Sequence, residues 1–131
     1  MNRSPEGTFG DELHLVVPPY AAYLRAVRLV AADAAVRAGL DCEEVEDFRL
    51  AVDELCQALI RGTDHVIVLS FHSTDGNVNA RGAARGRDGF AGNMNELSET
   101  IVASLADDYQ FDCEGGDLAF SVSRRRAGAR R

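Results

Sequence analysis

Lysine is absent from this chain of 131 residues, so its 14 basic residues are all arginines, against 21 acidic residues. The resulting net charge of -7 opposes nonspecific binding to nucleic acid, because contacts between basic side chains and phosphates supply most of that affinity. We therefore expect no nucleic-acid partner, and a basic protein surface suits the charge better. The missing lysine and the abundant alanine are typical of a GC-rich bacterial genome and indicate no particular activity.

Long hydrophobic runs are also missing. No apolar stretch approaches the roughly 18 residues of a membrane span, and residues 1–10 lack a hydrophobic signal core. We expect a cytoplasmic protein that makes no membrane contact. The length suits one domain with a single core.

Cysteine is scarce, and Cys42, Cys56 and Cys113 show no C-x-x-C spacing. An odd number of widely separated cysteines in a cytoplasmic chain predicts buried or half-buried free thiols. The histidines have no carboxylate or cysteine at metal-ligand spacing, so we expect no zinc site.

The hydrophobic periodicity predicts an α+β protein. Helical spacing covers 19–38, 41–62 and 96–107, where Asp41 and Glu44 form a capping-box pattern, and strands are expected at 13–17, 65–71, 77–86 and in a closing hairpin through Phe111 and Phe120. This order predicts a two-layer sandwich with the helices on one face of a mixed sheet. We expect residues 12–124 to form the domain, between a disordered N-terminus (1–11) and a disordered basic tail (125–131).

The segment 48–61 is the most informative part of the chain. Its apolar residues fall on one helical face, whereas Glu54, Ala58 and Arg61 share the flank beside that face. A core helix is the simplest interpretation, in which Glu54 is a flanking carboxylate paired with Arg61 or with a residue of the sheet edge.

The letters LAVDELCQALIR in this segment resemble the AVSEACTNAVxH helix of anti-sigma regulatory factors, which are serine-protein kinases of the GHKL (histidine-kinase-like) ATPase superfamily. In that family the helix supplies a glutamate as general base and, four residues later, an asparagine that holds the magnesium of ATP. The resemblance places Glu54 at the position of the base. Ala58 stands at the position of the asparagine, so Glu54 is a vestigial catalytic candidate.

The resemblance extends over roughly residues 12–124. The strand at 13–17 with Pro18-Pro19 and the run 20–38 resemble the family's first strand and helix, and 101–111 with Gly115-Gly116 and 118–123 resemble its last helix and hairpin. The resemblance implies that Arg28 contacts a sigma factor, and Arg25 is a second candidate for partner binding. A planar guanidinium suits this role because it binds a carboxylate bidentately. The family also favours a homodimer.

The remaining ATP-binding motifs of the family are incomplete. Where its D-x-G-x-G loop should lie, Asp88 is followed by Gly-Phe-Ala-Gly92, which has the wrong spacing, and Gly116-Asp117 replaces a glycine-threonine. The resemblance therefore implies the loss of the magnesium ligand, the adenine contact and part of the phosphate site. We expect no bound ATP or magnesium and no catalysis.

These observations predict an anti-sigma factor that inhibits an alternative sigma factor in a bacterial stress response and is released by a STAS-type antagonist without ATP-driven phosphorylation. One alternative is an active serine-protein kinase in which Gln57 or a water completes the magnesium shell. Another is an adaptor that binds only STAS proteins or kinases.

Overall fold

The protein is described by a computed structural model that covers residues 11–90 and 94–128. Its elements follow in the order β1 (Asp11–Val17), a 3-10 turn η1 (Ala21–Tyr23), α2 (Leu24–Arg37), α3 (Cys42–Gly62), β2 (Ile67–Thr74), β3 (Asn77–Arg85), α4 (Glu96–Leu105), β4 (Asp108–Glu114) and β5 (Asp117–Arg125). Every expected helix and strand is present. The largest shift in a boundary is at the first helix, which was expected from residue 19: a 3-10 turn occupies Ala21–Tyr23, and the α-helix begins at Leu24. Strand β2 also begins and ends later than expected.

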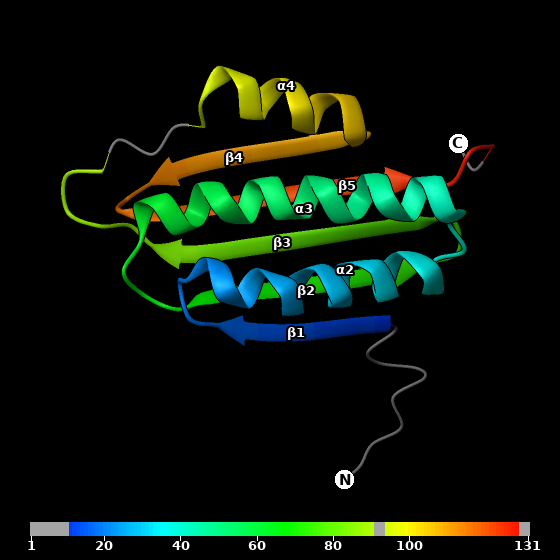
Figure 1. Ribbon diagram of the computed structural model, residues 1–131, viewed down its shortest axis with the longest axis horizontal. Helices are drawn as coiled ribbons and strands as arrows, with labels where there is room; N and C mark the ends of the chain where they lie inside the picture. The colour runs from blue at the N-terminus through cyan, green and yellow to red at the C-terminus, as the bar shows by residue number, and fades with distance from the viewer. Residues whose placement is uncertain (1–10, 91–93, 129–131) are drawn as a thin grey trace, which may run out of the picture.

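The strands form one sheet in the order β1-β2-β3-β5-β4, and α2, α3 and α4 all lie on one face of it (Figure 1). The predicted two-layer α+β sandwich is confirmed. The sheet, however, is antiparallel throughout, so the expected mixed sheet is wrong. The reason is the path of the chain. After β3 the segment with α4 leads the chain back to the end of the sheet where β3 begins, so β4 runs in the same direction as β3. Strand β5 lies between these two strands and runs opposite to both.

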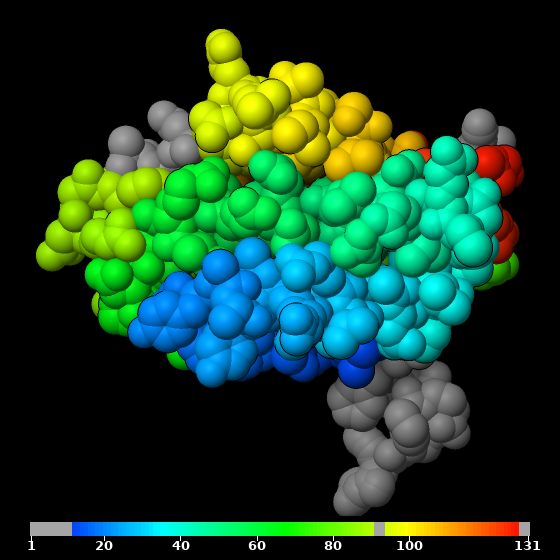
Figure 2. Space-filling model, in the orientation of Figure 1, coloured from blue at the N-terminus to red at the C-terminus, as the bar shows by residue number. Residues whose placement is uncertain are grey.

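Helix α3 lies in the centre of the helical layer, between α2 and α4 (Figure 2). Its N-terminus has the predicted capping box, because Asp41 accepts a hydrogen bond from the Glu44 amide (2.8 Å) and Glu44 accepts one from the Asp41 amide (2.8 Å). Its apolar face is fully buried at Phe48, Val52, Leu55, Cys56 and Leu59. This face packs against inward-facing strand residues such as Phe71, Val78 and Leu118, and the core lies between the layers.

Within residues 11–90 and 94–128, no helix covers the opposite face of the sheet. Strand β2 shows the consequence, because its residues alternate between a buried side that faces the helices and an open side. Val68, on the open side, is 47% exposed, whereas its neighbours Ile67 and Leu69 are fully buried.

The C-terminal arginines correct the predicted disordered tail. Strand β5 continues to Arg125, and Arg124 donates to Asp47 of α3 (3.1 Å). Beyond the strand, Arg126 donates to Asp75 (3.1 Å), and the Ala127 amide donates to Glu44 Oε2 (2.7 Å). The chain is therefore fixed to the N-terminal end of α3 through residue 127, and only 129–131 of the expected tail lie outside the described residues. The expected N-terminal segment, apart from its last residue in β1, also lies outside them.

Candidate functional site

Glu54 lies on α3, half-buried, at the side that faces α4. Its Oε2 accepts a hydrogen bond from the hydroxyl of Ser98 (3.0 Å), and Ser98 is buried in the first turn of α4. Asn95 caps this turn by accepting a hydrogen bond from the Ser98 amide (2.7 Å). The carboxylate therefore links the two helices, and the expected partners of Glu54, Arg61 or a residue of the sheet edge, were wrong.

Ala58 lies one helical turn after Glu54 and is 2% exposed. Its methyl group belongs to the hydrophobic core. A methyl group is no magnesium ligand, and its burial leaves no open position beside it for a longer polar side chain without repacking.

The loop after β3 is fixed to the end of α3. The Arg87 amide donates to the Gly62 carbonyl (2.6 Å), and its guanidinium donates to the carbonyl of Arg61 (2.8 Å) and reaches the carboxylate of Asp64 (3.3 Å). The ring of Phe90 then covers Gly62, where an added Cβ would lie 2.3 Å from a ring carbon. At this end of α3 the segment thus presents an apolar ring. Asp88 is exposed and makes no hydrogen bond or ion pair with any residue that the structure describes.

Arg28 projects from α2 toward α3, where its Nη1 lies 2.9 Å from Oδ1 of Asp53. The other carboxylate oxygen of Asp53 accepts a hydrogen bond from Gln57 (2.9 Å), which holds the carboxylate in place. The side chain of Arg28 remains 34% exposed, so part of it still faces solvent. Arg28 therefore has a structural role in addition to any contact with a partner.

Arg25 lies one turn earlier on α2 and is exposed, without a hydrogen bond or ion pair to the described parts of the chain. It shares the outer side of the helix with Leu29 and Val36, which are 68% and 60% exposed. We call Arg25, Leu29 and Val36 the α2 stripe. Two large apolar side chains beside an unpaired arginine on one helix side are suited to contact another protein.

The cysteines differ from one another. Cys56 is buried in α3, and this burial raises the pKa of its thiol. Cys42 and Cys113 are exposed, which corrects the expectation that all the thiols are buried or half-buried. Across residues 11–90 and 94–128, no group of three or more His, Cys, Asp or Glu side chains is placed to hold a metal ion.

Three pairs of interacting side chains at this site were not predicted. The pattern Asn95-x-x-Ser98 is a recognisable helix cap, but nothing local pairs Ser98 with Glu54, which is 44 positions away. Asp53 is 25 positions from Arg28, and Arg87 is 23 positions from Asp64, so these pairs also depend on how the helices and loops pack.

No helix within the described ranges is long and apolar enough to span a membrane.

Comparison with known proteins gives a likeness of fold. No protein-family model matches the sequence, and no curated protein matches it. Among solved structures, the chain is similar to the RsbU and RsbW domains of Rv1364c from Mycobacterium tuberculosis, with a TM-score of 0.69 and 21% identity over 88% of this chain. The chain spans 32% of the length of that structure. This likeness shows that the two-layer fold is shared.

Proposed function

We propose that this protein is an anti-sigma factor of the kinase-like type that acts by binding rather than by catalysis. It holds an alternative sigma factor inactive and releases it when a STAS-type antagonist competes for the same protein. The observation that carries the proposal is the α2 stripe, an exposed apolar and basic helix side on a fold shared with a structure that contains an RsbW domain.

The surroundings of Glu54 support binding over phosphoryl transfer. A general base must reach the proton that it removes, but Glu54 accepts a hydrogen bond from a buried serine, and the neighbouring position that would hold magnesium is the buried Ala58. Phe90, which covers Gly62, adds a third departure from a nucleotide site. Without ATP, release depends on competition between partners and on their concentrations.

The charge of the partner follows from the stripe. Arg25 is unpaired within the described ranges. The Arg28 side chain is 34% exposed, and its guanidinium is held by Asp53, which Gln57 holds in turn. A preorganised guanidinium binds a carboxylate with less loss of side-chain entropy. We therefore expect the sigma factor to contribute an acidic residue next to an apolar helix side.

The decisive experiment joins capture with a functional assay. The chain is used to capture partners from its host, the captured sigma factor is purified, and transcription by the holoenzyme is measured with increasing amounts of the chain. Inhibition without ATP, followed by recovery when the STAS antagonist is added, supports the proposal. Capture of STAS proteins or kinases with no effect on any sigma factor would favour the adaptor function.

A further inference from the structure

The open face of the sheet is hollowed where its side chains are small. Val68 of β2 pairs with Ala83 of β3, and Ala83 pairs with Ala119 of β5, so these three side chains lie next to one another on the open face. All three residues are exposed. Two hollows, of about 510 Å³ and about 330 Å³, are both lined by these three residues, so the hollows adjoin each other. We call the two hollows together the sheet groove.

The size and the rigidity of the sheet groove suit a small molecule. Ligand sites in proteins usually have volumes of about 300–1,000 Å³, with mostly apolar walls and a few polar groups. Each hollow lies within that range. The floor of the groove is formed by β2, β3 and β5, which are paired with one another along their lengths. A ligand therefore binds without the cost of ordering a loop.

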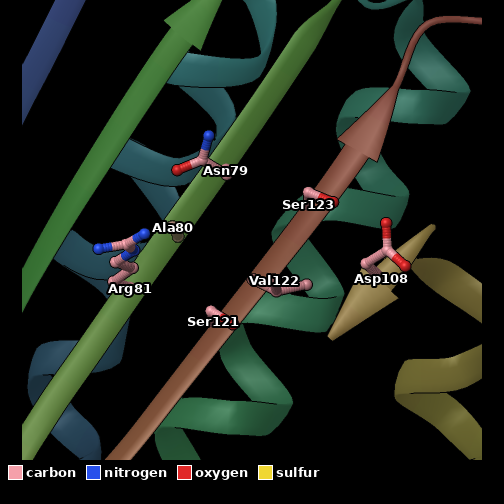
Figure 3. A pocket seen from close by; sticks show the side chains of 7 residues that line it. All are labelled: Asn79, Ala80, Arg81, Asp108, Ser121, Val122 and Ser123. Atoms are coloured by element: carbon pink, nitrogen blue, oxygen red, sulfur yellow. The ribbon is translucent and has the colours of Figure 1, made fainter. Parts of the chain in front are cut away.

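One end of the sheet groove carries an arginine without a partner. Arg81 lines the smaller hollow, is exposed, and makes no hydrogen bond or ion pair with any residue that the structure describes. Its paired neighbours are Ser70 of β2 and Ser121 of β5, and His14 of β1 lies beyond Ser70 in the same row. Figure 3 shows Arg81 and Ser121 on this side of the sheet, with the helices behind. This end therefore offers a guanidinium and two hydroxyl groups to an anion.

Other charges on this face are offset by a charge of opposite sign. Asp108 of β4 lies 3.6 Å from Arg125. At the far end of the groove, Arg85 of β3 pairs directly with Asp117 of β5, so the two charges there are neighbours. The free positive charge is therefore at the Arg81 end, and the middle of the groove is apolar.

We infer that the sheet groove binds an amphipathic carboxylate, a small molecule with one carboxylate and an apolar chain, such as a medium-chain fatty acid. The carboxylate accepts hydrogen bonds from Arg81 and the neighbouring serines. The apolar chain lies over Val68, Ala83 and Ala119 and points toward Arg85, which is about 13 Å from Arg81 along β3. Its removal from water supplies most of the affinity.

This site is separate from the proposed contact with a sigma factor. The groove is on the open side of the sheet, whereas the α2 stripe is on the helical side of the molecule. Binding of a carboxylate can therefore be measured with the chain alone, and its failure would leave the proposed anti-sigma function untouched.

Titration calorimetry of the full chain with octanoate, decanoate and dodecanoate tests the inference. Two further CH₂ groups should tighten binding by roughly tenfold at each step, because they are buried in the groove. Decanol has the same chain as decanoate without the charge, and it should bind about tenfold more weakly. No binding of dodecanoate at millimolar concentration, or equal affinities for decanol and decanoate, overturns the inference.

Substitutions at the two ends of the proposed contact locate the site. Arg81→Gln keeps a long polar side chain but removes the charge, so it should weaken decanoate binding by roughly tenfold. Ala119→Ile fills the space that the two hollows share, and should weaken dodecanoate binding by tenfold or more, while a β-branched residue suits a strand. Arg61→Gln changes an exposed arginine of α3 and is the matched control. Equal affinities in all three variants overturn the inference.

The same titration distinguishes the ligand from a second copy of the chain on this face. The affinity for dodecanoate should be the same at low and at tenfold higher chain concentration. A weaker affinity at the higher concentration, together with a sedimentation mass above that of one 14.2 kDa chain, would show that a second copy covers the groove and would overturn the inference.

Discussion

At the scale of single residues, Glu54 shows how the surroundings of a side chain decide its role. A carboxylate on a core helix can act as a base only if its oxygens reach a substrate. Here one oxygen binds the hydroxyl of Ser98, which the turn capped by Asn95 holds in place. The interaction spans two helices and contributes to the packing of α4 on α3.

The link between Glu54 and Ser98 is tested by a double-mutant cycle. Glu54→Ala and Ser98→Ala should each lower the free energy of unfolding by about 1 kcal/mol, with a coupling energy of similar size. The reason is that each substitution removes one partner of the hydrogen bond between the Ser98 hydroxyl and the Glu54 carboxylate. The measurement is urea denaturation. Ser104→Ala is the matched control, because Ser104 donates to a carbonyl of its own helix, and its coupling to Glu54→Ala should be near zero. A vanishing coupling in both cycles would show that the hydrogen bond contributes nothing.

The thiols provide a second test at this scale. Burial raises the pKa of Cys56, so at neutral pH its thiol stays protonated and is shielded from reagents, whereas Cys42 and Cys113 are exposed. We expect an aromatic disulfide reagent to label two thiols of the folded chain rapidly, and the third only at the rate of unfolding. Replacing Cys56 by alanine should remove the slow phase alone. Rapid labelling of three thiols would mean that α3 opens locally.

At the scale of elements, the sequence predicted most of the fold because the helices and strands are marked locally. The capping box at Asp41 and the periodic apolar face of α3 each have a local pattern, and both are observed. The antiparallel sheet was not predicted, because the insertion of β5 between β3 and β4 leaves no mark in any single segment. The order of strands is decided by packing.

The α2 stripe allows a prediction at the element scale. Arg28→Glu would place a carboxylate against Asp53, so it should reduce stability as well as binding, and the structure thus makes it a poor probe of the interface. Arg25→Glu should leave stability unchanged within about 0.5 kcal/mol, because the side chain is exposed. Its affinity for the captured sigma factor should fall by roughly 30-fold or more if the contact becomes buried on binding.

Arg85→Glu is the matched control for Arg25→Glu, since Arg85 is an exposed arginine of β3 on the sheet rather than on the helical layer. Titration calorimetry with the purified sigma factor gives both affinities. Equal, small losses in the two variants would place the sigma-factor contact elsewhere than the α2 stripe.

At the scale of the whole molecule, the helical layer and the open sheet offer two separate surfaces. The site along α3 could be predicted only in part from sequence. Glu54 and Ala58 lie one turn apart on the same helix, so their proximity is a local feature. The other residues come from segments that only the folded chain brings near α3, namely Ser98, Arg87 and Phe90. The sequence led us to expect that this chain lacks the ATP-binding residues of the family that it resembles. It could not show which side chains occupy the neighbourhood in their place.

Binding of ATP would affect the stability of the whole chain, which makes thermal unfolding the broadest test. A ligand at 100 times its dissociation constant stabilises a protein by about 2.7 kcal/mol, a rise in Tm of roughly 5–15 °C for a domain of this size. We expect millimolar ATP with magnesium to produce no such rise. Ala58→Asn should not create one, because Phe90 still covers Gly62, and should lower stability by about 1–3 kcal/mol, since Ala58 is 2% exposed and the amide would be buried. A magnesium-dependent rise in the unaltered chain would instead support the kinase function, with Gln57 or a water completing the magnesium shell.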